Sequence, residues 1–155
     1  MRNLGLAVLA VAVWIAPAAA REDPAAGASA YVWNTYTDTS IAFGIPDTDD
    51  RALRIDCEGG KTLVLIAPAD PGSAGSDGRI RVIASTDAGM DMLEGELIEL
   101  GDGPNVSAPL PSPSDALAGL MAGGDLTLMM LGEERVIPGA GAAAVLGPLI
   151  KACGR

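Results

Sequence analysis

Carboxylates and thiols are the groups in this sequence that could do chemistry, because the chain contains no histidine. Without histidine neither a Ser-His-Asp triad nor a Cys-His pair can form, and the commonest zinc ligand is missing. The two cysteines, Cys57 and Cys153, are far apart and form no C-x-x-C motif, so the usual thiol redox pattern is missing as well. Candidate catalytic residues are therefore limited to acidic side chains.

An acidic segment offers the densest group of candidate metal ligands. Asp47, Asp49 and Asp50 lie within four residues, and carboxylate oxygens in a loop suit a hard cation such as Ca²⁺. The full twelve-residue calcium-loop pattern is not there, and short acidic loops are common on protein surfaces. Two interpretations follow: a weak calcium site, or a solvated acidic turn in which Asp50 pairs with Arg51 or Arg54.

A second pair of carboxylates, Glu94 and Glu96, has the spacing of two residues on one face of a strand. Paired carboxylates can hydrolyse a glycosidic bond, with one acting as the acid and the other as the base or nucleophile. The alternative interpretation is an exposed polar face of an acidic protein.

Four residues form a candidate binding surface: Trp33, Asp47, Asp70 and Asp77. Trp33 is one of few aromatic residues, and its alternative role is a core tryptophan that seals one end of a sheet. Asp70 and Asp77 belong to a turn-rich segment, residues 68–78, that predicts a long surface loop.

The first twenty residues have the pattern of a signal peptide. A short basic start precedes an apolar core at residues 4–15, which is too short to span a bilayer, and small residues at 18 and 20 predict cleavage after Ala20. We therefore expect a signal peptide at residues 1–20, a flexible leader at 21–29, and a single β-rich domain at 30–155. The expected location is periplasmic or secreted, and the cleaved chain is not expected to span a membrane.

An exported chain with two cysteines favours a disulfide between Cys57 and Cys153. Such a bond closes a loop of roughly 100 residues, for which the chain-entropy estimate is about 4–5 kcal/mol of stabilisation. The alternative is a pair of free, buried thiols.

The net charge narrows the classes of partner. The chain carries −10 at neutral pH, and cleavage after residue 20 removes Arg2 and no acidic residue, giving −11. This charge disfavours nucleic acid and anionic membrane surfaces as partners. The same acidity also has a simpler explanation, which is solubility.

Alternating and continuous apolar runs predict a mainly β fold. We expect eight or nine short strands with two short helices, arranged as a single antiparallel β-sandwich or a partly closed barrel. The stretch 52–67 predicts a hairpin around Gly59-Gly60, whose second strand is covered on both sides. At 90–100 the apolar phases conflict, which predicts a bulge at Gly95 or two short strands. The predicted helices cover 114–121 and 142–152, and the disulfide would dock the second on the sheet.

The order of these features resembles small exported bacterial proteins of uncharacterised function. The shared pattern is Trp33, then the segment IPDTDD at 45–50, then the Cys57 strand, and finally a terminal helix that ends in Cys153. The resemblance covers nearly the whole mature chain. It implies that the protein is exported and implies no particular activity.

The sequence thus favours a non-enzymatic binding protein of the cell envelope that needs no cofactor and binds an unknown protein or envelope component. Two alternatives remain: a calcium-dependent or carboxylate-based activity at the acidic loop, and a secreted hydrolase inhibitor. The last rests on fold-level analogy with small disulfide-bearing periplasmic lysozyme inhibitors.

Overall fold

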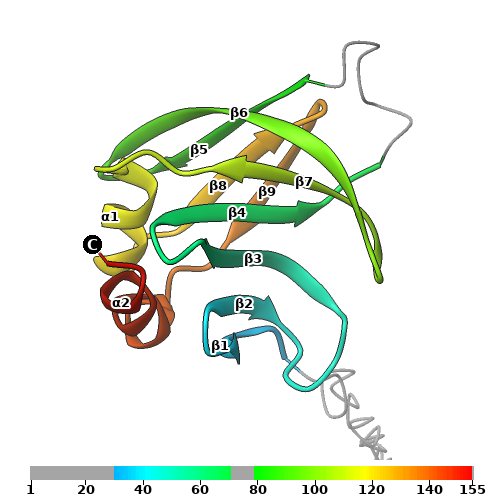
Figure 1. The fold of residues 1–155 in the computed structure, drawn as a ribbon. Coiled ribbons are helices and arrows are strands. Elements are labelled where there is room, and N and C mark those ends of the chain that lie inside the picture. The colour runs from blue at the N-terminus through cyan, green and yellow to red at the C-terminus, as the bar shows by residue number, and fades with distance from the viewer. Residues whose placement is uncertain (1–29, 71–78, 155) are drawn as a thin grey trace, which may run out of the picture.

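The protein is built on one antiparallel sheet, as a computed structural model that describes residues 30–70 and 79–154 shows (Figure 1). The predicted signal peptide, the leader and most of the 68–78 loop, including Asp77, lie outside the described residues. The sheet has nine strands in the order β1-β2-β3-β4-β7-β6-β5-β8-β9, and it does not close, which confirms the mainly β class with two helices. The elements are β1 Val32–Thr37, β2 Ser40–Gly44, β3 Arg51–Glu58, β4 Thr62–Pro68, β5 Arg79–Thr86, β6 Gly89–Leu100, β7 Gly103–Pro109, α1 Asp115–Met121, β8 Leu126–Met130, β9 Glu133–Ile137 and α2 Ala142–Ala152.

The hairpin of β3 and β4 forms as the sequence predicts. Gly59 and Gly60 both have left-handed backbone angles, with φ of 57° and 68°, and glycine adopts these without steric cost. The turn sets the register that places Cys57 opposite Leu63. From Leu63 to Ala67 every residue of β4 is buried, so β4 is the central strand covered on both faces.

Strand β6 contradicts the expected bulge or break at Gly95. It is one strand of 12 residues, and its register with β5 runs without a shift from Glu96 opposite Arg79 to Gly89 opposite Thr86. The conflict between the apolar phases is resolved by placing two methionines on the solvent face, in line with the glutamates. Gly95 points inward, where an added Cβ would lie 2.9 Å from a Val106 methyl of β7. The glycine therefore permits close packing against β7 and does not mark a bulge.

Strand β6 also connects the two halves of the sheet. Its first part pairs with β5 and its last part pairs with β7, with Glu96 in both registers. Figure 1 shows β6 arching across the top of the molecule, with the two helices gathered at one end of the sheet. Helix α1 contacts β5, β6 and β8, whereas α2 contacts β1 and β2.

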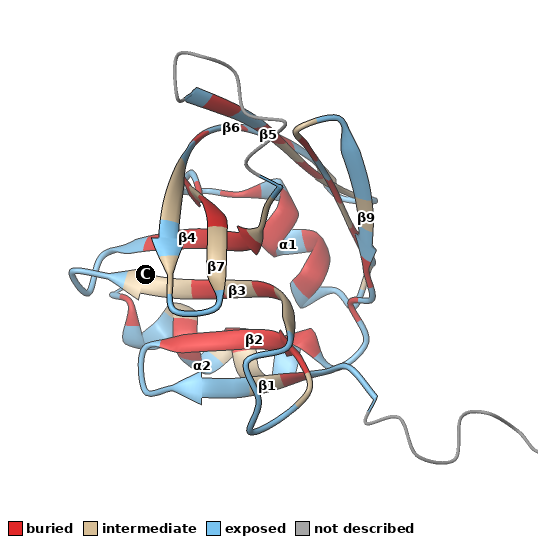
Figure 2. Cartoon of the chain, turned by 90° about the vertical axis from the view of Figure 1, so that its right-hand side faces the viewer, coloured by how far each residue is buried: buried red, intermediate tan, exposed pale blue. Residues whose placement is uncertain are grey.

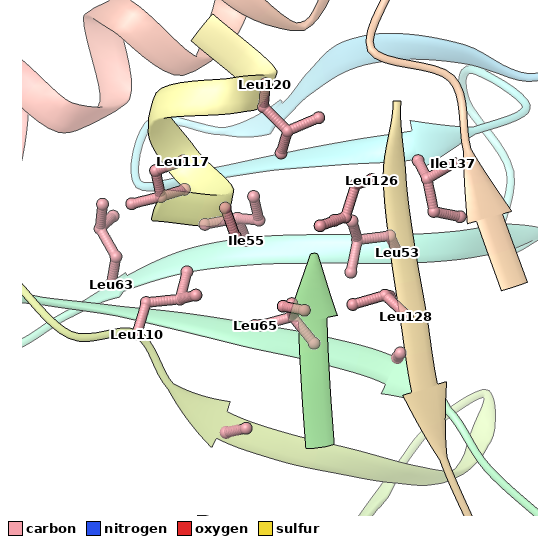
Figure 3. Packing of buried hydrophobic residues seen from close by; sticks show 14 of the residues in the cluster. Leu53, Ile55, Leu63, Leu65, Leu110, Leu117, Leu120, Leu126, Leu128 and Ile137 are labelled. Carbon is pink, nitrogen blue, oxygen red and sulfur yellow. The ribbon is translucent and has the colours of Figure 1, made fainter. Parts of the chain in front are cut away.

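One hydrophobic core lies between the inner face of the curled sheet and the helices. Figure 3 shows leucines of α1 and aliphatic residues of β3, β4 and β8 pointing into a shared space. Because the core draws on strands from both halves of the sheet, the fold buries it as a single unit. Its largest fully buried side chains are Ile41, Leu53, Ile55, Leu63, Leu65, Leu120, Leu126, Leu128, Leu146, Val82, Val106 and Cys153.

A disulfide joins Cys57 and Cys153, as predicted, with their Cα atoms 5.6 Å apart. Cys153 is the residue that caps the C-terminal end of α2, and it is fully buried. The bond therefore fastens the last helix to the β3 strand near the middle of the chain. Helix α2 is continuous through Pro148. Among the described residues, no helix is both long and apolar enough to cross a membrane.

Trp33 links the two edges of the open sheet. It lies on the edge strand β1, and its indole Nε1 donates a hydrogen bond to the carbonyl oxygen of Pro138 at 2.6 Å. Pro138 directly follows the other edge strand, β9. The ring is 8% exposed and packs on Phe43, with 5.5 Å between ring centroids. Trp33 thus seals one end of the sheet.

Candidate functional site

The acidic loop between β2 and β3 directs two of its three carboxylates to different partners. Asp49 accepts an ion-pair hydrogen bond from Arg51 at 2.6 Å, and its side chain is 85% exposed. Asp50 accepts a hydrogen bond from the Tyr31 hydroxyl, which raises the pKa of Tyr31 above its ordinary value. Asp47 occupies a left-handed backbone conformation with φ of 61°. In the described ranges 30–70 and 79–154, no three cysteine or carboxylate side chains converge where they could hold a metal ion. The geometry therefore does not support the predicted calcium site.

Two arginines stabilise the sheet surface beside this loop. The Arg51 guanidinium stacks over the Tyr36 ring at 4.1 Å from the centroid and lies 3.8 Å from Asp102 at the tip of the β6–β7 hairpin. The side chain of Arg51 is 7% exposed. Arginine on an aromatic face gains a cation–π attraction, and desolvation strengthens it. Arg51 therefore ties together β1, β3 and the β6–β7 hairpin.

The neighbouring pair, Arg54 and Asp56, has an N–O distance of 2.9 Å on β3. Burial raises the pKa of Asp56 above its ordinary value, and the attraction of Arg54 and Arg51 offsets only part of that rise. A hollow of about 380 Å³ lies nearby, lined in part by Asn34, Tyr36 and Asp47. The charged residues that line it are Asp47, Asp49 and Arg51, and Asp49 is paired with Arg51.

Glu94 and Glu96 face solvent on β6, with each opposite an arginine of β5. They line an open hollow of about 640 Å³ together with Glu58, Arg79 and part of β4. Glycoside hydrolysis needs two carboxylates in contrasting environments, one able to hold a proton and one ionised. Both glutamates are exposed and both lie opposite an arginine, and Glu96 also lies opposite Ser107 of β7. The arrangement fits an exposed polar surface.

One of the four residues proposed as a binding surface is buried in the described part of the chain. Trp33 is in the core, and Asp47 lines its hollow beside Tyr36, an exposed aromatic residue that the sequence analysis did not single out. Asp70 is exposed just after β4, and Asp77 lies outside the described residues. The structure therefore removes Trp33 from the candidate surface.

A different surface stands out on the outer face of β6, β5, β8 and β9. We call it the methionine face and define it by Met90, Met92, Ile83, Met129 and Val136. Cross-strand registers align them in two rows: Met92, Ile83 and Met129 lie directly opposite one another, and the Met90 row reaches Val136 through Ser85 and Thr127.

The exposure of this face is large for apolar side chains. Met92 is 75% exposed, Met90 and Val136 are both 56% exposed, and Met129 is 45% exposed. Figure 2 shows β9 largely exposed at one side of the molecule. Neighbouring strands lie about 4.8 Å apart, so opposed side chains on this face are in contact range. The signal in the sequence was that Met90 and Met92 are an even number of residues from Glu94 and Glu96, which places all four side chains on the same face of the strand.

Acidic side chains border the methionine face on two sides. Asp87 in the β5–β6 turn and Asp125 before β8 line a hollow of about 400 Å³ together with Val136. Glu134 lies opposite Met129 on β9. At the remaining end, Arg81 of β5 lies opposite Glu94 of β6, and their charges offset each other.

No protein-family profile, curated protein or solved structure matches this chain. The resemblance to small exported bacterial proteins therefore stays a prediction.

Proposed function

We propose that this protein is an exported, non-enzymatic binding domain of the cell envelope, and that it recognises a partner with the methionine face. The observation that carries the proposal is a row of apolar side chains, Met92, Ile83 and Met129, that lie directly opposite one another on three adjacent strands, with exposed Met90 and Val136 beside the row. Single exposed apolar residues are ordinary, but contiguous patches are typical of interaction sites. Methionine suits such a surface because its unbranched, polarizable side chain adapts to different partner shapes.

Export is supported by two independent features of the chain. Residues 1–20 have the basic, apolar and small-residue order of a signal peptide. The disulfide between Cys57 and Cys153 suits an oxidising compartment. N-terminal sequencing of protein recovered from the periplasm or medium tests this part, and a mature chain that still begins at Met1 would contradict it.

Binding is favoured over catalysis by the positions of the acidic groups. Asp49 and Asp50 are engaged with Arg51 and Tyr31, and the two glutamates of β6 face arginines. The exposed apolar face is the feature that the stability of the domain does not explain.

The test uses a matched pair of variants. Met92→Gln with Met129→Gln makes the face polar, whereas Met121→Gln replaces a methionine on α1 that is 39% exposed and outside the face. Exposed substitutions change stability by only about 0.5 kcal/mol, so all three proteins should fold. Affinity capture from native envelope, quantified by mass spectrometry, should recover a partner with wild type and Met121→Gln but not with the double variant. A partner recovered equally by the double variant would contradict the proposal.

A further inference from the structure

We infer that the occupant of the methionine face is a polypeptide segment of another protein that carries apolar side chains together with lysine or arginine. This inference rests on the proposed function and adds the chemistry of the partner. It follows from the apolar side chains of the face and from the charge around them.

The charge around the apolar centre is negative. Asp87, Asp125 and Glu134 border the face on two sides, while Arg81 is offset by the glutamate opposite it. Removing apolar surface from water gives the binding energy, and the rim selects among partners by the sign of their charge. Basic side chains beside an apolar stretch complement this rim, and acidic ones are repelled by it.

A second copy of this chain fits the face poorly. Stacking two methionine faces would bring the acidic rims of both copies together, in a chain that already carries −10. Like charges brought together across an interface repel each other and suppress that pairing. An anionic lipid surface is disfavoured for the same reason. A basic, apolar segment has neither penalty.

Three synthetic peptides test the inference. Each has the same length and four leucines that alternate with polar residues, which are lysine in the first, glutamine in the second and glutamate in the third. Binding is measured by calorimetry at low and high salt. Protein labelled with ¹³C at its methionine methyl groups then reports the site by NMR. Met130, which is 3% exposed, provides the internal reference.

We expect the lysine peptide to bind at least about tenfold more tightly than the glutamate peptide at low salt, and this difference should shrink at high salt. The methyl signals of Met90, Met92 and Met129 should shift, and that of Met130 should not. Asp87→Asn with Glu134→Gln should reduce the preference for lysine, and Met92→Gln with Met129→Gln should weaken binding of all three peptides.

Distinct outcomes separate the two proposals. Equal binding of the three peptides at the methionine face overturns the inference and leaves the face as a binding site. A lysine peptide that binds without shifting the methyl signals of Met90, Met92 or Met129 also overturns it. Sedimentation that shows a dimer, broken by Met92→Gln with Met129→Gln, identifies a second copy as the occupant instead. In the capture experiment described above, equal recovery of a partner by wild type and by Met92→Gln with Met129→Gln refutes the proposed binding function of the methionine face itself.

Discussion

The link between β6 and α1 gives the sharpest test of how the fold is held together. Asp91 is 8% exposed, and its carboxylate accepts hydrogen bonds from the Ser114 hydroxyl at 2.6 Å, from the backbone N–H of Ala116 at 3.1 Å, and from that of Asp115 at 3.3 Å. Ser114 is the N-cap residue, whose oxygen in turn accepts from the Leu117 N–H. A strand carboxylate therefore completes the cap of a seven-residue helix.

The perturbation is Asp91→Ala. Hydrogen bonds to a charged group each contribute about 1.5–3 kcal/mol, and their losses do not add fully. The change also leaves a buried hydroxyl and a buried backbone N–H of the helix start without this acceptor. We therefore expect the free energy of unfolding to fall by about 3 kcal/mol. Asp91→Asn keeps one acceptor oxygen and should cost about 1–2 kcal/mol.

Urea unfolding of the oxidised protein, followed by circular dichroism, measures these differences. Glu99→Ala, an exposed acidic residue on the same strand, is the matched control and should change stability by no more than about 0.5 kcal/mol. Ser114→Ala should cost about 1 kcal/mol, and the loss in the double variant should fall short of the sum of the two single losses by up to about 1 kcal/mol, because the residues share a bond. A loss below about 1 kcal/mol for Asp91→Ala, or full additivity, would refute the reasoning.

Three further predictions concern the disulfide, the buried acid and the acidic loop. Replacing Cys57 and Cys153 together by alanine opens a loop with a sequence separation of 96 and should lower the free energy of unfolding by about 4–5 kcal/mol in urea titrations; a loss under about 1 kcal/mol would contradict this. The folded-state pKa of Asp56 is raised, so the folded protein holds its proton to higher pH than the unfolded chain, and stability should fall as pH rises from the ordinary value of 3.8 through the raised one. Asp56→Asn should flatten that fall in melting temperature against pH, and an unchanged profile would exclude Asp56 as its source. Because Asp49 and Asp50 are directed to Arg51 and Tyr31, millimolar Ca²⁺ should neither release heat in calorimetry nor raise the melting temperature.

Local patterns predicted the elements that depend on local physics. The Gly59-Gly60 turn and the apolar run of β4 specify a hairpin with a buried strand, because turn geometry and side-chain period are set within a few residues. The disulfide between the cysteine on that hairpin and the cysteine at the end of α2 was predicted because an exported chain with two cysteines favours a bond between them.

Long-range arrangement could not be predicted from the same patterns. Pairing of β4 with β7 and of β5 with β8 depends on contacts between distant segments. The link from Asp91 to Ser114 spans 23 residues and has no sequence signature. The hydrogen bond by which Trp33 links the two edges of the sheet is made to Pro138, which lies 105 residues away.

The methionine face was missed for a different reason. Apolar residues are expected to face inward, but Met90 and Met92 alternate onto the opposite face of the strand from Leu93 and Leu97. The sequence analysis therefore predicted a bulge or a break that would bring both sets inward. The structure keeps an unbroken register and leaves the methionines outside. A functional surface departs from the pattern that stability alone would favour, and such departures are where sequence reasoning fails.

Methionine oxidation measures the central claim most directly, because the face carries its own probes. Dilute peroxide converts exposed methionines to sulfoxides, and peptide mapping by mass spectrometry gives a rate for each. In the free protein Met92, Met90 and Met129 should react faster than buried Met130. In the complex with its captured partner those three rates should fall together, while the rate of Met121 on α1 stays unchanged. Unchanged rates at Met90, Met92 and Met129 in the complex would contradict the assignment of the methionine face as the binding surface.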